Sequence, residues 1–148
     1  HGQVELWLEG SVLRIVAEGP FNREAVQAVS RAMHDLLAGV MPGKPFAVLL
    51  EMRVSLLASP DALAAFEEFL RAMSSARIAP KVVAYVVAPE IEGRSLMLPL
   101  YADIYARQQR LFAAFETQAE ARSCGVSFRR SPTSSAKLLR LTSASLRA

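Results

Sequence analysis

Residues 44–73 constrain the fold more than any other segment, because they read as a buried strand, a short loop and a capped amphipathic helix. Residues 46–50 (FAVLL) form a continuous apolar run, which is typical of a strand covered on both faces. Ser59 can cap a helix, and Pro60 suits the first helical position, where its missing N–H costs nothing. In an open α/β sheet, ligands bind beyond the carboxyl ends of the strands. Residues 51–61 are therefore the predicted location of a functional site. Apolar side chains then recur at helical spacing at Leu63, Phe66, Leu70 and Met73.

Length and composition predict one globular domain followed by a short appended segment. The chain has 148 residues, of which 52% are hydrophobic and 21% charged, so it can bury a real core. We predict a domain over residues 1–125 and a tail over 126–148, where the composition changes. No apolar run approaches the ~20 residues of a membrane span, and no secretory signal is predicted at the start. The one cysteine, Cys124, cannot form an internal disulfide, so we expect a cytoplasmic setting.

The net charge of +3 combines two parts of opposite sign. Residues 126–148 hold five basic and no acidic residues, whereas residues 1–125 hold 12 basic and 14 acidic ones. The body is therefore mildly acidic, and we do not expect it to bind nucleic acid. The Ser-rich, leucine-containing tail reads either as a basic amphipathic element or as a flexible extension. On the first interpretation, the tail alone would contact an anionic membrane or nucleic acid.

The rest of the chain predicts strands and helices in the order ββαβαβαβα. Residues 4–9 and 12–17 form a hairpin around Gly10-Ser11, a two-residue turn with glycine first. Asn22 caps the first helix, and Thr117 opens a capping box for the last one. Because strands separated by helices pair in parallel, we predict an α/β fold. Its mixed sheet would have about five strands, with a parallel core, an N-terminal hairpin and helices packed on the sheet. The elements between are a strand at 82–87, a helix at 96–110 that is regular only after Pro99, and an edge strand at 111–115. The core is predicted to centre on Val48, Leu49, Leu50, Val83, Tyr85 and Val86.

This order of elements resembles a STAS-type domain, and most closely the small bacterial branch called SpoIIAA-like. The resemblance is carried by Gly19-Pro20-Phe21-Asn22 before the first helix and by residues 44–53 (KPFAVLLEMR) through the central strand. Ser59-Pro60 at the second helix and Phe115 with Glu120-Ala121 near the end add to it. It covers roughly residues 3–123. The resemblance implies a STAS-like fold.

The same resemblance implies a non-catalytic regulatory or protein-interaction module, as in anti-sigma-factor antagonists. Its partner would be another protein or a second copy of the chain. Those antagonists carry a phosphorylated serine after an aspartate at the start of the second helix; here Ser59 stands at the aspartate and Pro60 at the serine. The predicted partner-binding residues are Arg53, Ser55, Ser59 and Asp61. The alternative for Ser59 is a plain helix cap, and for Arg53 and Ser55 a solvated loop.

A second hypothesis is a carrier or sensor of a small apolar or lipid-like ligand. Tyr101, Tyr105, Phe112 and Met97 are spaced so that they either pack in the core or wall an apolar pocket. The pocket predicted on this hypothesis is enclosed by Tyr85, Leu98, Tyr101 and Tyr105.

Enzymatic function is the weakest interpretation of the sequence. Ser30, His34 and Asp35 include a nucleophile, a base and an orienting group, yet Asp35 is adjacent to His34 and points elsewhere on a helix. The sequence has no nucleophile elbow, no GxGxxG and no Walker A motif. With two histidines and one cysteine, a zinc site is improbable. We therefore expect no catalytic residue, no metal and no cofactor.

Overall fold

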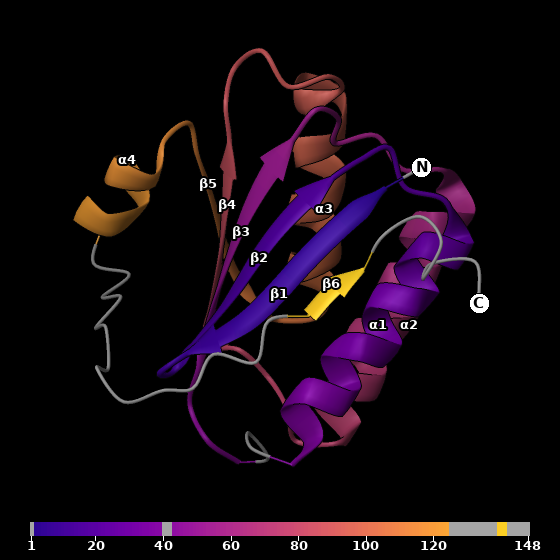
Figure 1. Cartoon of the computed structure of the whole chain (residues 1–148), viewed down its shortest axis with the longest axis vertical. Coiled ribbons are helices and arrows are strands. Elements are labelled where there is room, and N and C mark those ends of the chain that lie inside the picture. The colour runs from indigo at the N-terminus through magenta and orange to yellow at the C-terminus, as the bar shows by residue number, and fades with distance from the viewer. Residues whose placement is uncertain (1, 40–42, 125–138, 142–148) are drawn as a thin grey trace.

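A computed structural model describes residues 2–39, 43–124 and 139–141. Helices and strands alternate after an initial hairpin (Figure 1). The strands are β1 (Gln3–Glu9), β2 (Val12–Glu18), β3 (Ala47–Arg53), β4 (Val82–Val87), β5 (Leu111–Phe115) and β6 (Leu139–Leu141). The helices are α1 (Arg23–Ala38), α2 (Pro60–Ser75), α3 (Arg94–Arg107) and α4 (Gln118–Ser123).

The strands form one mixed sheet in the order β5-β4-β3-β2-β1-β6. The β1–β2 hairpin is antiparallel, and β2 to β5 pair in parallel. The predicted α/β class, hairpin and parallel core are therefore confirmed. The structure adds β6, which the sequence did not predict and which pairs antiparallel with β1.

Local signals at the element ends behave as the sequence indicates. Glu9 pairs with Val12 across a turn in which Gly10 has φ 61, a conformation that glycine adopts without strain. The Asn22 side chain accepts a 2.9 Å hydrogen bond from the Ala25 amide and so caps α1.

Helix α3 departs from the prediction, because it begins before Pro99 rather than after it. It starts at Arg94, and the Met97 amide donates a 2.8 Å hydrogen bond to the Gly93 carbonyl in its first turn. Pro99 lacks the N–H that would pair with the carbonyl of Ser95, but Ser95 is exposed, so water can satisfy that carbonyl.

The two faces of the sheet carry layers of very different size. Tyr85 and its alternate neighbours on β4 face the large core, which also takes side chains from α1, α2 and α3. Leu49 and Val86 face the opposite way, where Ala121 of α4 and Phe115 pack on them. Five of the six predicted core residues are buried; the sixth, Leu50, is only half-buried although it lies in a central strand.

Candidate functional site

The loop between β3 and α2, the location predicted from the sequence, is held tightly against its neighbours. Ser55 is fully buried, and its Oγ accepts a 3.2 Å hydrogen bond from the Leu57 amide. Ser55 also bridges in parallel to Glu92, in the loop between β4 and α3. A Cβ at Gly19 would lie 2.2 Å from the Ser55 carbonyl oxygen, so the β2–α1 connection passes directly over this residue. Ser55 therefore supports the loop, and its prediction as a partner contact is wrong because a partner cannot reach it.

The other predicted contact residues are occupied by local interactions. Arg53 is exposed and pairs with Glu51 at 2.9 Å, and this carboxylate raises the pKa of the guanidinium. The Ser59 hydroxyl accepts from the Ala62 amide at 3.3 Å and donates to the Asp61 carboxylate. That hydrogen bond lowers the pKa of Asp61. Ser59 is thus the helix cap that the alternative interpretation predicted.

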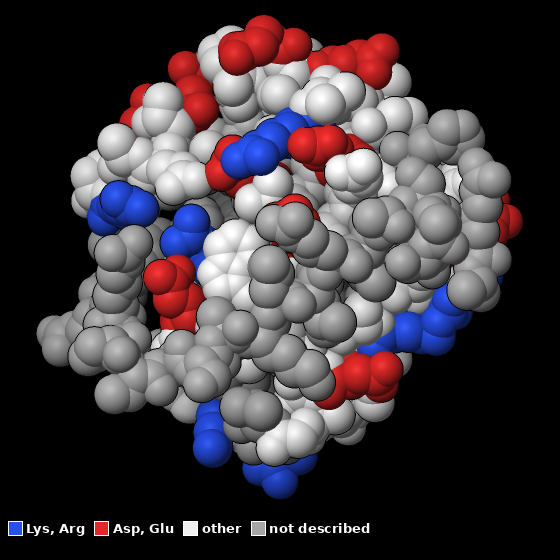
Figure 2. Space-filling model, in the orientation of Figure 1, with Lys and Arg blue, Asp and Glu red and all other residues white. Residues whose placement is uncertain are grey.

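The carboxyl end of the sheet is mainly acidic. Figure 2 shows acidic side chains gathered at the top of this face, with basic side chains mostly lower. Glu18 ends β2, Glu90 and Glu92 follow β4, and Glu116 follows β5; in β3, which ends at Arg53, Glu51 lies two residues before the end. Arg94, which could offset them, donates to the Val87 carbonyl at 3.0 Å and lies 3.8 Å from Glu116. This edge therefore disfavours an anionic partner.

Val54, at the tip of the same loop, was not singled out in the sequence. Its φ is 66, a conformation that is an outlier for a β-branched residue, and it is 63% exposed. Strain of this kind concentrates at functional positions and persists where surrounding contacts impose it. Only the fold reveals it, because Val54 follows directly on a strand-like run.

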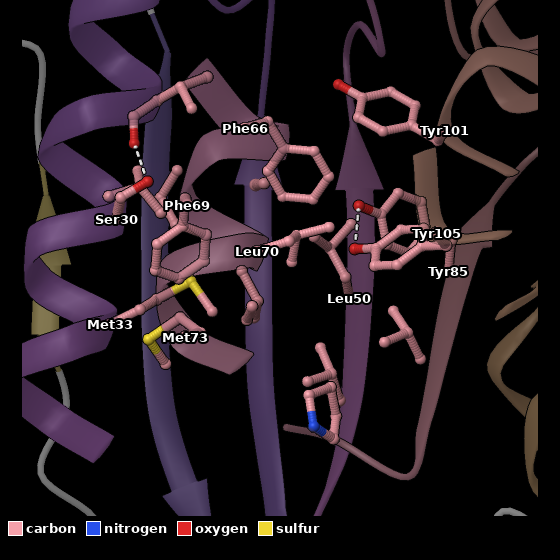
Figure 3. A pocket seen from close by; sticks show the side chains of 18 of the residues that line it. Ser30, Met33, Leu50, Phe66, Phe69, Leu70, Met73, Tyr85, Tyr101 and Tyr105 are labelled. Carbon is pink, nitrogen blue, oxygen red and sulfur yellow. Dashed lines mark hydrogen bonds between the residues drawn. The ribbon is translucent and has the colours of Figure 1, made fainter. Parts of the chain in front are cut away.

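The second candidate site is an apolar cavity between the sheet and helices α1 and α2, with α3 at one side (Figure 3). Its volume is about 120 Å³. Apart from Ser30 and three tyrosines, its lining side chains are all apolar, and no charged residue lines it in the described ranges. An engineered apolar cavity of ~150 Å³ stays dry and binds benzene, so a space of this size and character can hold a small molecule.

Leu50 shows that this space reaches the middle of the fold. The residue lies in β3 between β2 and β4, and its neighbours Val48 and Leu49 are 6% and 1% exposed. Leu50 itself remains half-buried because it faces the cavity. Three methionines, Met33, Met52 and Met73, form part of the wall, and their flexible side chains can adapt to a guest.

An aromatic cluster closes the α3 side of the cavity. The hydroxyls of Tyr85 and Tyr105 are 2.9 Å apart, and both side chains are buried. Phe66 packs edge-on against Tyr105 at 5.7 Å, and Phe112 stacks on it at 4.9 Å. Burial raises the pKa of Tyr85 and Tyr105, and raises that of Tyr101 to about 12. All three phenols therefore stay protonated at physiological pH.

The structure keeps most of the predicted pocket and enlarges it. Tyr85, Tyr101 and Tyr105 line the cavity as predicted, whereas Leu98 does not, because it packs partly buried against the core beside it. The sequence missed the contributions of α1 and α2. Their apolar faces are visible in the helical spacing, but that spacing cannot tell a filled interface from an open one. On these two helices, the missed lining residues include Met33, Phe66, Phe69 and Met73.

The remaining sequence candidates do not assemble into a catalytic group. Ser30 donates its hydroxyl proton to the Val26 carbonyl at 2.7 Å rather than to His34. His34 and Asp35 lie 3.7 Å apart on an exposed surface of α1. Within the described ranges, no three His, Cys, Asp or Glu side chains are placed to hold a metal ion. None of the described helices has the length and apolar character that crossing a bilayer requires.

Comparison of the chain with family models, with curated proteins and with solved structures finds no match.

Proposed function

We propose that this protein binds a small, largely apolar molecule in the cavity between the sheet and α1 and α2, as a carrier or sensor. The observation that supports the proposal is the half-buried Leu50 at the centre of the sheet. Protein cores are normally packed to the density of organic crystals, with few voids larger than a water molecule. A space of about 120 Å³ at this position leaves dispersion contacts unmade. A bound molecule would make those contacts.

Filling the cavity tests this proposal. In protein labelled with [¹³C-methyl]methionine, we expect benzene to shift the methyl resonances of Met33 and Met73, which line the cavity. Met97 is buried outside the lining and serves as an internal reference. Native mass spectrometry of the full chain then reports the mass of a ligand retained through purification.

The test variant is Leu50→Trp, which places a larger side chain in the space. The matched control is Leu111→Trp, where the same replacement occurs at a leucine that is 71% exposed. We expect Leu50→Trp to abolish the benzene shifts and Leu111→Trp to preserve them. Equal shifts in both variants, or none in the wild type, would contradict ligand binding at this site.

A protein-interaction function, the expectation from the STAS resemblance, remains a second proposal. The exposed Val54 in its unfavourable backbone conformation favours it, because an apolar side chain is held toward solvent there. If this loop mediates self-association, sedimentation velocity should show a dimer that Val54→Asp weakens. A monomer at all concentrations would argue against the homodimer. On either proposal we expect a cytoplasmic protein.

A further inference from the structure

The polar groups inside the cavity limit which molecules can bind there. Four lining residues carry a hydroxyl, namely Ser30, Tyr85, Tyr101 and Tyr105. The Ser30 proton is already donated to the Val26 carbonyl. Figure 3 shows the hydroxyls of Tyr85 and Tyr105 joined by a hydrogen bond at the ring ends that point into the pocket, and the Tyr101 hydroxyl apart from them.

The tyrosine pair has one more proton than it can use. Each phenol carries one O–H donor, so two protons are present, and a single O···O contact of 2.9 Å can contain only one of them. Within the described part of the chain, neither hydroxyl has another hydrogen-bond partner. No described protein group is therefore placed to accept the second proton. Burial raises both phenol pKa values, so deprotonation does not remove this proton at physiological pH.

An unsatisfied buried donor is costly and rarer in proteins than an under-used acceptor. We infer that the ligand is an uncharged molecule with a hydrogen-bond acceptor, such as a carbonyl, ether or aromatic nitrogen, that takes the second proton of the Tyr85–Tyr105 pair. The inference rests on the proposed function and adds the ligand's chemical class. A charged ligand is disfavoured, since the described lining offers no opposite charge to compensate its desolvation.

Benzene and pyridine form a matched pair of probes for this inference. They are nearly the same size and shape, and pyridine adds one acceptor nitrogen and no donor. At neutral to mildly basic pH pyridine is uncharged. The dissociation constants of both are measured from the Met33 and Met73 methyl shifts of the full-length protein. The ratio of the two dissociation constants is then compared between the wild type and each variant, so that the different hydration of the two probes cancels.

The test variant is Tyr85→Phe/Tyr105→Phe, which keeps both rings and removes both hydroxyls. We expect its affinity for pyridine relative to benzene to fall about two- to tenfold, the value of a neutral hydrogen bond. Tyr101→Phe, which removes the third tyrosine hydroxyl of the lining, is the competing arm and should lower the ratio less than the double variant does. The control is Ser75→Ala, which removes an exposed hydroxyl of α2 outside the lining and should leave the ratio unchanged. A thermal melt of each variant establishes that it is folded.

Each outcome bears on one of the two proposals. An unchanged affinity for pyridine relative to benzene in the double variant would overturn the role of the pair while leaving benzene binding intact. A larger fall of this relative affinity in Tyr101→Phe than in the double variant would overturn it too. Pyrrole, which donates but lacks a comparable acceptor, extends the test. If the double variant loses affinity for pyrrole instead of affinity for pyridine, the pair acts as an acceptor and the inference is wrong. If benzene fails to bind the wild type, the proposed function fails, and this inference fails with it.

Discussion

Leucines 49 and 50 are adjacent in β3 and face opposite sides of the sheet, so replacing each by alanine measures how well each side is packed. Leu49 is 1% exposed and packs in the cluster with Val86 and Ala121, whereas Leu50 is half-buried against the cavity. Leu→Ala removes three carbons, which at ~0.8 kcal/mol each gives about 2.4 kcal/mol of lost transfer free energy. A new cavity in a rigid core raises this cost toward about 5 kcal/mol.

We expect Leu49→Ala to lower the free energy of unfolding by ~2–5 kcal/mol. Leu50→Ala should cost at least ~1 kcal/mol less, because part of its surface already faces open space and loses no contacts. Urea titration measures both free energies of unfolding. If the dependence of the unfolding free energy on urea concentration is the same in both variants, their unfolded states are comparable. Equal losses for the two variants would refute the view that Leu50 borders a cavity. A loss well below 1 kcal/mol for Leu49→Ala would show that β3 is not a central strand.

Three further predictions address the helix cap, the buried phenols and residues 126–148, which include β6. Ser59→Ala should cost ~0.5–2 kcal/mol in a denaturant titration, while Ser59→Asp, which can still cap α2, should retain most of the stability; equal losses would refute the cap. Because burial raises the pKa of Tyr101 to about 12, the unfolded state loses its proton first, so stability is intact below ~pH 10 and falls as the pH rises from there. Tyr101→Phe should reduce that fall by about 1.4 kcal/mol per pH unit between pH 10 and 12, as measured by urea titration at several pH values. If the unfolding free energy falls equally steeply with pH in the variant and the wild type, the buried state of Tyr101 is contradicted. Residues 1–125 alone should melt cooperatively within a few degrees of the full chain, because β6 pairs with only three residues of β1. Aggregation of this shorter protein on size-exclusion chromatography would show instead that the edge of β1 needs β6 as a pairing partner.

The elements that the sequence predicted correctly are those whose signals are local. The apolar run at 46–50 indicated β3, glycine at position 10 indicated the hairpin turn, and Asn22 and Ser59 indicated two helix starts. Each signal depends on the conformation or hydrogen bonding of a few neighbouring residues, so it can be recognised without the rest of the fold. The α/β class followed from the order of these elements.

Tertiary structure decided the features that matter for function. Ser55 is polar and lies in a loop, so the sequence suggested exposure, yet the β2–α1 and β4–α3 connections contact its loop and the residue is fully buried. Helix α3 continues through Pro99, and the carbonyl that loses its amide partner there belongs to an exposed residue. The cavity depends on how closely α1 and α2 approach the sheet and on whether side chains from these separate elements fill the gap. Hydrophobic spacing reports which face of an element turns inward, but the volume left between two such faces is a property of their assembly.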